Sequence, residues 1–420
     1  MGASLKVRWL GAVTLAALAA VAVGGAVRAA AGWPMTRRGD LWFVETPHYE
    51  FETDYAPKAA QLLASHQEAL FLELYRRMGK TRSAAAIQRM KVYVYQTEDR
   101  YRQVMGDGSE GTRGLYTGTA MGAWGSQDDL DETLEVLRHE GTHQFVRQFI
   151  GETCPVWLNE GLAVYFQNAT FEKGKLVSGQ APMPTVNFLK KALEGDKLMP
   201  VALMLTLSDE SWRAATRTRS KYASIQYAQA WSMVHFLEAG DGGKYRTPFL
   251  QYVYFLSRKA SPDEAWQRSF GTNVAAFEKR WKAYIKDLKP TSGISCRTKM
   301  AMLGDWVLAA MKQPQCLKDI ETFRKVALTG ALGGWVVTVG GIETEIADRE
   351  SMADVFRCPQ DPSKGDAPSY ELVPGKPGEP PVVRCTHHVG VVLETTYVKD
   401  HEGKRRTRVV SRPILPGEKK

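Results

Sequence analysis

The 420-residue chain lacks several features that would define its class at once. Beyond residue 27 it has no apolar run long enough to cross a membrane. No internal repeat is visible, and 37 glycines and 20 prolines are too few for a collagen-like or low-complexity chain. Apolar residues make up 44% and charged residues 24%, which is typical of a folded protein with about two or three domains.

A large basic surface is also missing from the body of the chain. The net charge is +9, but residues 1–29 contribute +3 and residues 401–420 contribute +5, which leaves +1 for residues 30–400. We therefore expect no nucleic-acid partner. The basic tail, residues 401–420, could instead associate with an anionic membrane or cell wall.

The N-terminus has the layout of an export signal. Lys6 and Arg8 precede an uncharged run at residues 9–27, and small residues follow it. This predicts a signal peptide at residues 1–29 and a periplasmic or secreted protein. Because the run reaches the lower end of a membrane span, an inner-membrane anchor formed by residues 9–27 is the alternative.

Only five cysteines are present, and an exported protein can form disulfides between them. The short separations within the last third of the chain favour the pairs Cys296–Cys316 and Cys358–Cys385. A fully reduced chain is the alternative.

Local patterns predict an α+β fold in which strands come first and helices follow. Strands are expected in two short runs within 42–54, at 90–95 and at 114–124, with a helix at 56–78. Further helices are expected at 128–150, 155–167, 222–239, 245–258, 262–270 and 274–288. After residue 293 we expect one helix within 300–330 and β-rich runs at 334–346 and 382–398. The organisation predicted is a main domain at 40–289, a small β-rich accessory domain at 294–400 and a tail at 401–420.

One of these helices carries the segment His139-Glu140-Gly141-Thr142-His143. Residues four apart share a helix face, so His139 and His143 can present two imidazoles to one metal ion. Glu140 lies beside them, where it can activate a water molecule.

Tetrahedral zinc with two histidines and water needs one more protein ligand. The next helix contains Trp157-Leu158-Asn159-Glu160-Gly161-Leu162-Ala163. Since a short link makes this helix antiparallel to the first, the Glu160 carboxylate can reach the same metal ion.

These two segments resemble the gluzincins, zinc metallopeptidases with a glutamate as third ligand, and the arrangement is similar to that of bacterial peptidase MA-like families. The resemblance implies a thermolysin-like zincin domain that binds Zn²⁺ through His139, His143 and Glu160, with Glu140 as general base. It implies that Asn159 supports the ligand geometry. Tyr227 matches the position of an oxyanion-stabilising tyrosine, and a packed core aromatic is the alternative reading.

Other residues depart from the aminopeptidase branch of that family. The segment 118–125 has no carboxylate to bind a free amine, although it could bind a peptide backbone by β-addition. Val164, one turn past Glu160, cannot orient a histidine, so another group must. His235 could contact substrate, but a half-buried structural histidine is the simpler interpretation.

The sequence thus predicts an exported enzyme that hydrolyses peptide bonds of a peptide or protein substrate with zinc. Two alternatives remain: a catalytically silent zinc-binding scaffold or cell-envelope binding protein on the same fold, and a membrane-tethered assembly protein.

Overall fold

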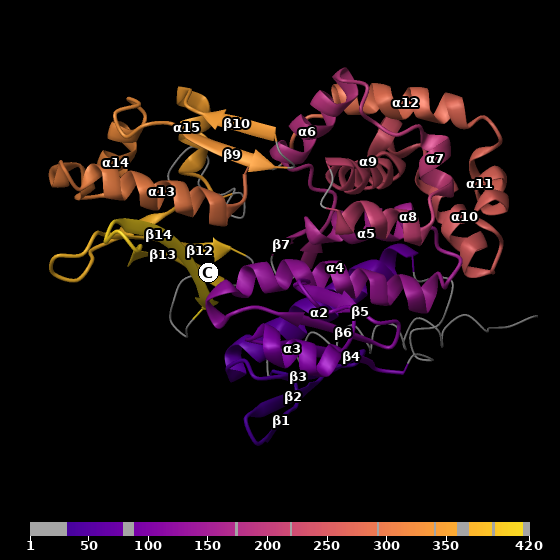
Figure 1. Ribbon diagram of the computed structural model, residues 1–420, viewed down its shortest axis with the longest axis horizontal. Helices are drawn as coiled ribbons and strands as arrows, with labels where there is room; N and C mark the ends of the chain where they lie inside the picture. Colours follow the sequence, from indigo (N-terminus) through magenta and orange to yellow (C-terminus); the bar gives the residue numbers. More distant parts are fainter. Residues whose placement is uncertain are drawn as a thin grey trace, which may run out of the picture.

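The computed structural model describes residues 32–78, 88–172, 175–218, 221–291, 294–339, 342–358, 369–388 and 391–414. It has a mixed α+β fold in which a six-stranded sheet, a helical layer and a C-terminal sheet follow one another along the chain (Figure 1). The predicted signal peptide or anchor lies outside the described residues. No helix among the described residues is both long enough and apolar enough to cross a membrane.

The N-terminal sheet has the strand order β1-β2-β3-β4-β6-β5. Its β3–β4 and β4–β6 pairs are parallel, and the other pairs are antiparallel. The strands are β1 (Met35–Arg38), β2 (Leu41–Glu45), β3 (Tyr49–Thr53), β4 (Met90–Tyr95), β5 (Gly114–Tyr116) and β6 (Ala120–Trp124). Alternate residues such as Phe51, Val92 and Val94 are buried, because each strand turns one side toward the core.

Three helices are associated with this sheet: α2 (Pro57–Met78), α3 (Glu98–Met105) and α4 (Leu130–Phe149). The apolar stripe of α2, with Leu63, Leu70 and Leu74, is fully buried. Helix α2 packs against α4, and α4 also contacts β5 and β6. In Figure 1, α4 lies between the sheet and the helical layer, so it is enclosed from both sides.

The helical layer follows the predicted order but has more elements than were expected. The predicted helices are α5 (Val156–Gln167), α9 (Lys221–Gly243), α10 (Arg246–Ser257), α11 (Pro262–Phe270) and α12 (Val274–Asp287). The additional elements are the hairpin β7 (Thr170–Glu172) and β8 (Lys175–Val177), with α6 (Met183–Glu194), α7 (Val201–Thr206) and α8 (Asp209–Arg217). Helix α5 packs between α4 and α9.

The segment 114–124 was predicted as one strand, and this was wrong. It forms an antiparallel hairpin, β5 and β6, with a turn around Gly118. Gly118 has φ +95°, a conformation that glycine adopts without steric cost, and there the chain reverses.

The C-terminal part consists of one helical group and two small sheets. Helix α13 packs on the antiparallel sheet β11-β12-β13-β14. The helices of the C-terminal part are α13 (Cys296–Ala310), the 3₁₀ turn η4 (Pro314–Leu317), α14 (Ile320–Ala327) and α15 (Arg349–Val355). Its strands are β9 (Trp335–Val339), β10 (Ile342–Ile346), β11 (Glu371–Val373), β12 (Val382–His388), β13 (Val391–Lys399) and β14 (Arg405–Pro413).

The expectation of a basic tail at 401–420 fails for residues 405–413, which form β14. This strand pairs with β13 over its whole length. Its exposed arginines, Arg406 and Arg408, alternate with inward-facing residues that include the buried Val409 and Ser411. Two of the charges that suggested a solvated tail, Arg406 and Arg408, therefore lie on the outer face of an ordinary strand.

Strand β14 also connects the C-terminal part to the start of α4. The Ser411 hydroxyl accepts a hydrogen bond from the Asp131 N–H (3.3 Å) and donates one to the Asp128 carbonyl (3.0 Å). The guanidinium of Arg297, in the first turn of α13, forms a two-pronged pair with the Asp131 carboxylate at 2.6 and 2.9 Å. Hydrogen bonds and an ion pair from the C-terminal part therefore stabilise the N-terminal end of α4.

Candidate metal centre

The candidate metal-binding segments lie on two packed antiparallel helices, α4 and α5. Arg138 on α4 donates to the carbonyl of Gln167, the last residue of α5, while His143 contacts Asn159 near the start of α5. Residue numbers thus rise along one helix as they fall along the other. This register places Glu160 opposite the interval between His139 and His143.

The three side chains expected as ligands meet at one point. The Glu160 Oε2 atom lies 3.5 Å from His139 Nε2 and 3.7 Å from His143 Nε2. One candidate ligand atom from each residue falls within 4.8 Å of the other two. The side chains are only 13–18% exposed, so the group is sheltered but open on one side.

Amide oxygens fix the orientation of both imidazoles. His139 Nδ1 lies 3.0 Å from Gln167 Oε1, and His143 Nδ1 lies 2.9 Å from Asn159 Oδ1. Since an amide oxygen only accepts, each Nδ1 carries a proton and donates it, which leaves Nε2 as the ring atom that faces Glu160 and is available to a metal ion. These amides supply the orienting groups that Val164 cannot provide.

The Glu160 carboxylate is suited to a cation. Its Oε2 is buried and has no hydrogen-bond partner among the described residues. Burial raises the pKa of this carboxyl, but His143, His139 and Arg213 lower it by more than burial raises it. The net shift of the pKa is downward, so the group is ionised at neutral pH. Two imidazole nitrogens and one carboxylate oxygen form a typical catalytic zinc ligand set, and the residues therefore fit the ion.

The same cluster also shifts the pKa of His139. Burial lowers its pKa, but the interaction with Glu160 and the charge of Glu140 outweigh burial and raise the pKa to about 9. A metal ion must therefore displace a proton from His139 at neutral pH.

Glu140 lies next to this group, against the edge of the sheet. Burial raises its pKa, while His143 and His139 lower it in part, and the net shift is upward. The backbone N–H of Tyr116 in β5 donates to its carboxylate. A side chain at Gly114 would place its Cβ 2.8 Å from Glu140 Cγ, so only glycine leaves room for Glu140 here.

The strand available for peptide binding is β5 and not β6. The 118–125 segment was expected to accept a peptide backbone by β-addition. Strand β6, however, already pairs with β4 on one side and with β5 on the other. Strand β5 is one of the two edge strands of the described sheet, the other being β1. It is also the edge strand that contacts Glu140.

Helix α9 approaches the metal centre very closely through Gly161, the residue after Glu160. A Cβ at Gly161 would lie 2.6 Å from the Ala230 carbonyl oxygen, so a larger residue would force α5 and α9 apart. The glycine in the Asn-Glu-Gly segment therefore serves helix packing.

Tyr227 on α9 borders the site. Its ring meets that of Trp212 edge to face, with centroids 5.1 Å apart. Burial raises the pKa of its hydroxyl, and the charges of Glu160 and Glu140 raise it further, so it is a protonated donor at neutral pH. The structure places Tyr227 near the two glutamates and also packs it against an aromatic ring.

His235 has a structural role. It is 5% exposed, its Nδ1 lies 2.6 Å from the Tyr284 hydroxyl, and its Nε2 lies 3.2 Å from the Gly179 carbonyl. Because Nε2–H donates to that carbonyl, Nδ1 accepts from Tyr284 and the ring is neutral. Burial accordingly lowers the pKa of His235.

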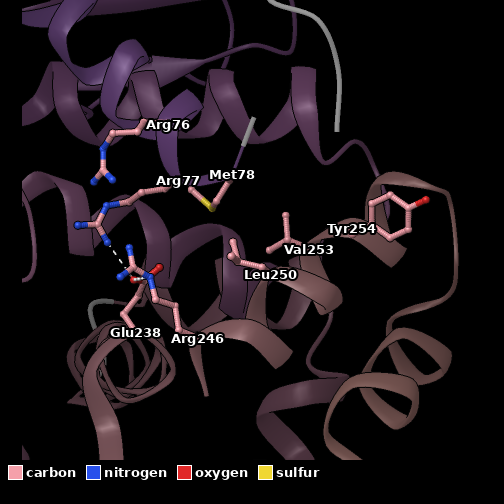
Figure 2. Close-up of a pocket in the computed structure, with 8 residues that line it drawn as sticks. All are labelled: Arg76, Arg77, Met78, Glu238, Arg246, Leu250, Val253 and Tyr254. Carbon is pink, nitrogen blue, oxygen red and sulfur yellow. Dashed lines mark hydrogen bonds and ion pairs between the residues drawn. The ribbon is translucent and has the colours of Figure 1, made fainter. Parts of the chain in front are cut away.

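A separate pocket lies between α2, α9 and α10 (Figure 2). Arg77 and Arg246 point toward Glu238, at 2.9 and 3.6 Å, and Leu250 and Val253 contribute its apolar wall. None of its lining residues belongs to the metal centre.

Sequence reasoning missed three contributors to the site. Gln167 lies seven residues after Glu160, and this spacing on one helix face could have revealed it. Gly114 and the Tyr116 backbone had no comparable signal, because they reach Glu140 only through the order of the strands.

Comparison with known protein families gives a match over about half of the chain. A search of curated proteins returns no significant match. The family profile of the Peptidase MA superfamily matches residues 73–287, which contain α4, α5 and α9. Because that match covers slightly more than half of the sequence, the chain belongs to the Peptidase MA superfamily.

Proposed function

We propose that this protein is a zinc-dependent peptidase of gluzincin type. The observation that carries the proposal is the convergence of His139 Nε2, His143 Nε2 and Glu160 Oε2 beside the Glu140 carboxylate. Membership in the Peptidase MA superfamily supports peptidase chemistry at this point. A zinc ion held by the three ligands would act as a Lewis acid toward the scissile carbonyl and the attacking water.

The roles of the protein groups follow from their positions. Glu140, with its raised pKa, accepts the proton of the attacking water and passes it to the departing amine. Gln167 and Asn159 keep the two imidazoles oriented. Tyr227, protonated at neutral pH, donates a hydrogen bond to the oxyanion that develops on the substrate.

The substrate in this proposal is an extended peptide that lies along β5. Its backbone would hydrogen-bond to the outer edge of that strand, which places a peptide carbonyl near Glu140. This mode of binding uses main-chain groups and does not require a free amino terminus.

Zinc content and peptide cleavage, measured together, test this function. Purified protein should contain one zinc ion per chain and cleave members of a peptide library, and a chelator should abolish cleavage until zinc is restored. His143→Ala should lose the zinc ion, whereas His235→Gln, outside the ligand set, should retain it. Zinc binding without cleavage of any peptide would instead favour a silent scaffold on this fold.

We further propose that the protein is exported and acts in the periplasm or outside the cell. The support is the arrangement of charged, apolar and small residues at the N-terminus. N-terminal sequencing of the mature chain distinguishes the outcomes: a start near residue 30 indicates cleavage, and an intact N-terminus indicates an anchor.

A further inference from the structure

Three cysteines of the C-terminal part meet in its core, far apart in sequence. Cys296 is the first residue of α13, Cys358 follows α15, and Cys385 lies in β12. Their exposed fractions are 3%, 2% and 0%, and one sulfur from each lies within 4.8 Å of the other two. We call this group the cysteine cluster.

The sulfur atoms of Cys296 and Cys358 lie 2.8 Å apart. Sulfur atoms that share no bond remain at van der Waals distance, which is clearly longer. A covalent bond between them would need an approach to about 2.05 Å, a shift of less than an ångström. The two sulfur atoms therefore already lie close to bonding distance.

We propose that Cys296 and Cys358 form a disulfide, with Cys385 as a neighbouring thiol that can exchange into it. This arrangement replaces the expected pairs Cys296–Cys316 and Cys358–Cys385. Cys316 lies elsewhere, where its sulfur faces the carbonyl of Gln313 at 2.9 Å.

Formation of this bond removes two electrons and two protons from the two thiols. A disulfide donor, either oxidised glutathione or a protein disulfide, is the oxidant. The thiolate of one cysteine displaces one donor thiolate and forms a mixed disulfide. The second cysteine then displaces the remaining donor thiolate, which closes the Cys296–Cys358 bond and leaves the donor as two thiols.

The distance between the sulfurs favours a disulfide over a metal ion in the cluster, because two thiolates bound to one tetrahedral zinc ion at about 2.3 Å would lie about 3.8 Å apart, well beyond the 2.8 Å seen here. Among the described side chains, the group holds the three sulfurs and no histidine or carboxylate. The nearby polar groups are the buried Tyr370 hydroxyl and the Lys299 ammonium. Lys299 is a cation that already binds the Asp354 carboxylate at 2.7 Å, and it cannot serve as an additional anionic ligand.

The disulfide would stabilise the junction with the metal helix. It links the first turn of α13 to the end of α15 across 62 positions of sequence. Arg297, the next residue after Cys296, holds Asp131 at the N-terminal end of α4. Any effect on hydrolysis rests on the proposed function, whereas the covalent link does not.

Thiol mapping of the full-length chain tests the link directly. The protein is refolded with a mixture of reduced and oxidised glutathione, denatured without reductant, alkylated and digested for mass spectrometry. We expect a cross-linked peptide that joins Cys296 to Cys358 and alkylated Cys154 and Cys316. Cys316→Ser, a buried cysteine outside the cluster, is the matched control and should keep the link.

Two variants test the role of Cys385. In Cys385→Ser the Cys296–Cys358 link should persist, and in Cys358→Ser it should move to Cys296–Cys385. Five alkylated cysteines in the wild-type chain, or a link that includes Cys316, would overturn the proposal. So would zinc that remains bound after His143→Ala and protects all three cluster cysteines from alkylation.

A stability measurement gives an independent readout. Reductant should lower the thermal midpoint of the wild-type protein by several degrees and should leave a Cys296→Ser/Cys358→Ser double variant unchanged. An equal response in both proteins would contradict the proposal. If the link is found but no peptide is cleaved, the disulfide stands and the proposed peptidase function fails.

Discussion

Replacement of Arg297 by methionine should destabilise the protein more than removal of any surface ion pair. The Asp131 side chain is only 3% exposed and receives two hydrogen bonds from Arg297, whose side chain is 18% exposed. Arg297→Met removes both hydrogen bonds and the guanidinium charge from beside this buried carboxylate. Loss of one partner of a buried pair costs about 3–5 kcal/mol, and we expect a decrease of that size in the free energy of unfolding.

Equilibrium unfolding in urea, followed by near-ultraviolet circular dichroism, measures this change. Arg268→Met is the control, because the Arg268–Glu264 pair is more than half exposed on both sides and should contribute less than about 1 kcal/mol. The double variant Arg297→Met/Asp131→Asn should regain part of the loss, since it also removes the buried negative charge. Equal, small losses in Arg297→Met and Arg268→Met would refute the view that β14 and α13 hold the metal helix.

Four further predictions concern the candidate metal centre. Gln167→Leu should weaken zinc binding about 10- to 100-fold, measured by competition with a chelator, because His139 loses the acceptor that orients it. Gly161→Ala should lower the thermal midpoint, because its Cβ would meet the Ala230 carbonyl oxygen at 2.6 Å. Below pH 9, zinc must displace the His139 proton, so calorimetry should show proton release and an affinity that rises about tenfold per pH unit. Unfolding of the metal-free protein should show the opposite trend, since stability from protonated His139 is lost as the pH rises from 6.5 through about 9.

The sequence predicted the elements that carry the candidate site because local patterns determine them. The four-residue spacing of His139 and His143 requires a helix, and both α4 and α5 begin and end within a few residues of the prediction. A short link between two helices left an antiparallel arrangement as the simplest option, and this brings Glu160 to the histidines. The contact between Asn159 and His143 agrees with the supporting role that the resemblance implied.

Features that depend on distant pairing could not be predicted in the same way. The place of β5 at the edge of the sheet follows from strand order, which no local pattern specifies. The strand at Arg405–Pro413 was hidden by its arginines, because their charge suggested a solvated tail although they occupy alternate outer positions. The cysteine cluster was missed because sequence proximity favoured other pairs, whereas the fold brings Cys296 close to Cys358.

Residues of the C-terminal part contact the start of α4 directly. Ser411 hydrogen-bonds to backbone groups at the start of α4, and Arg297 pairs with Asp131 in its first turn. Since His139 lies only two turns further along that helix, the C-terminal sheet fixes the helix that carries the ligands. We therefore regard α13 and β14 as part of the structural support for the candidate metal centre.

The central claim is that Glu140 acts as the base beside a zinc ion held by His139, His143 and Glu160. Zinc content and peptide cleavage by wild-type protein and Glu140→Gln, measured side by side, test it most directly. We expect one zinc ion per chain in both proteins and cleavage that is about 10²–10⁴-fold slower in the variant. Undiminished cleavage by a fully zinc-loaded Glu140→Gln protein would contradict it.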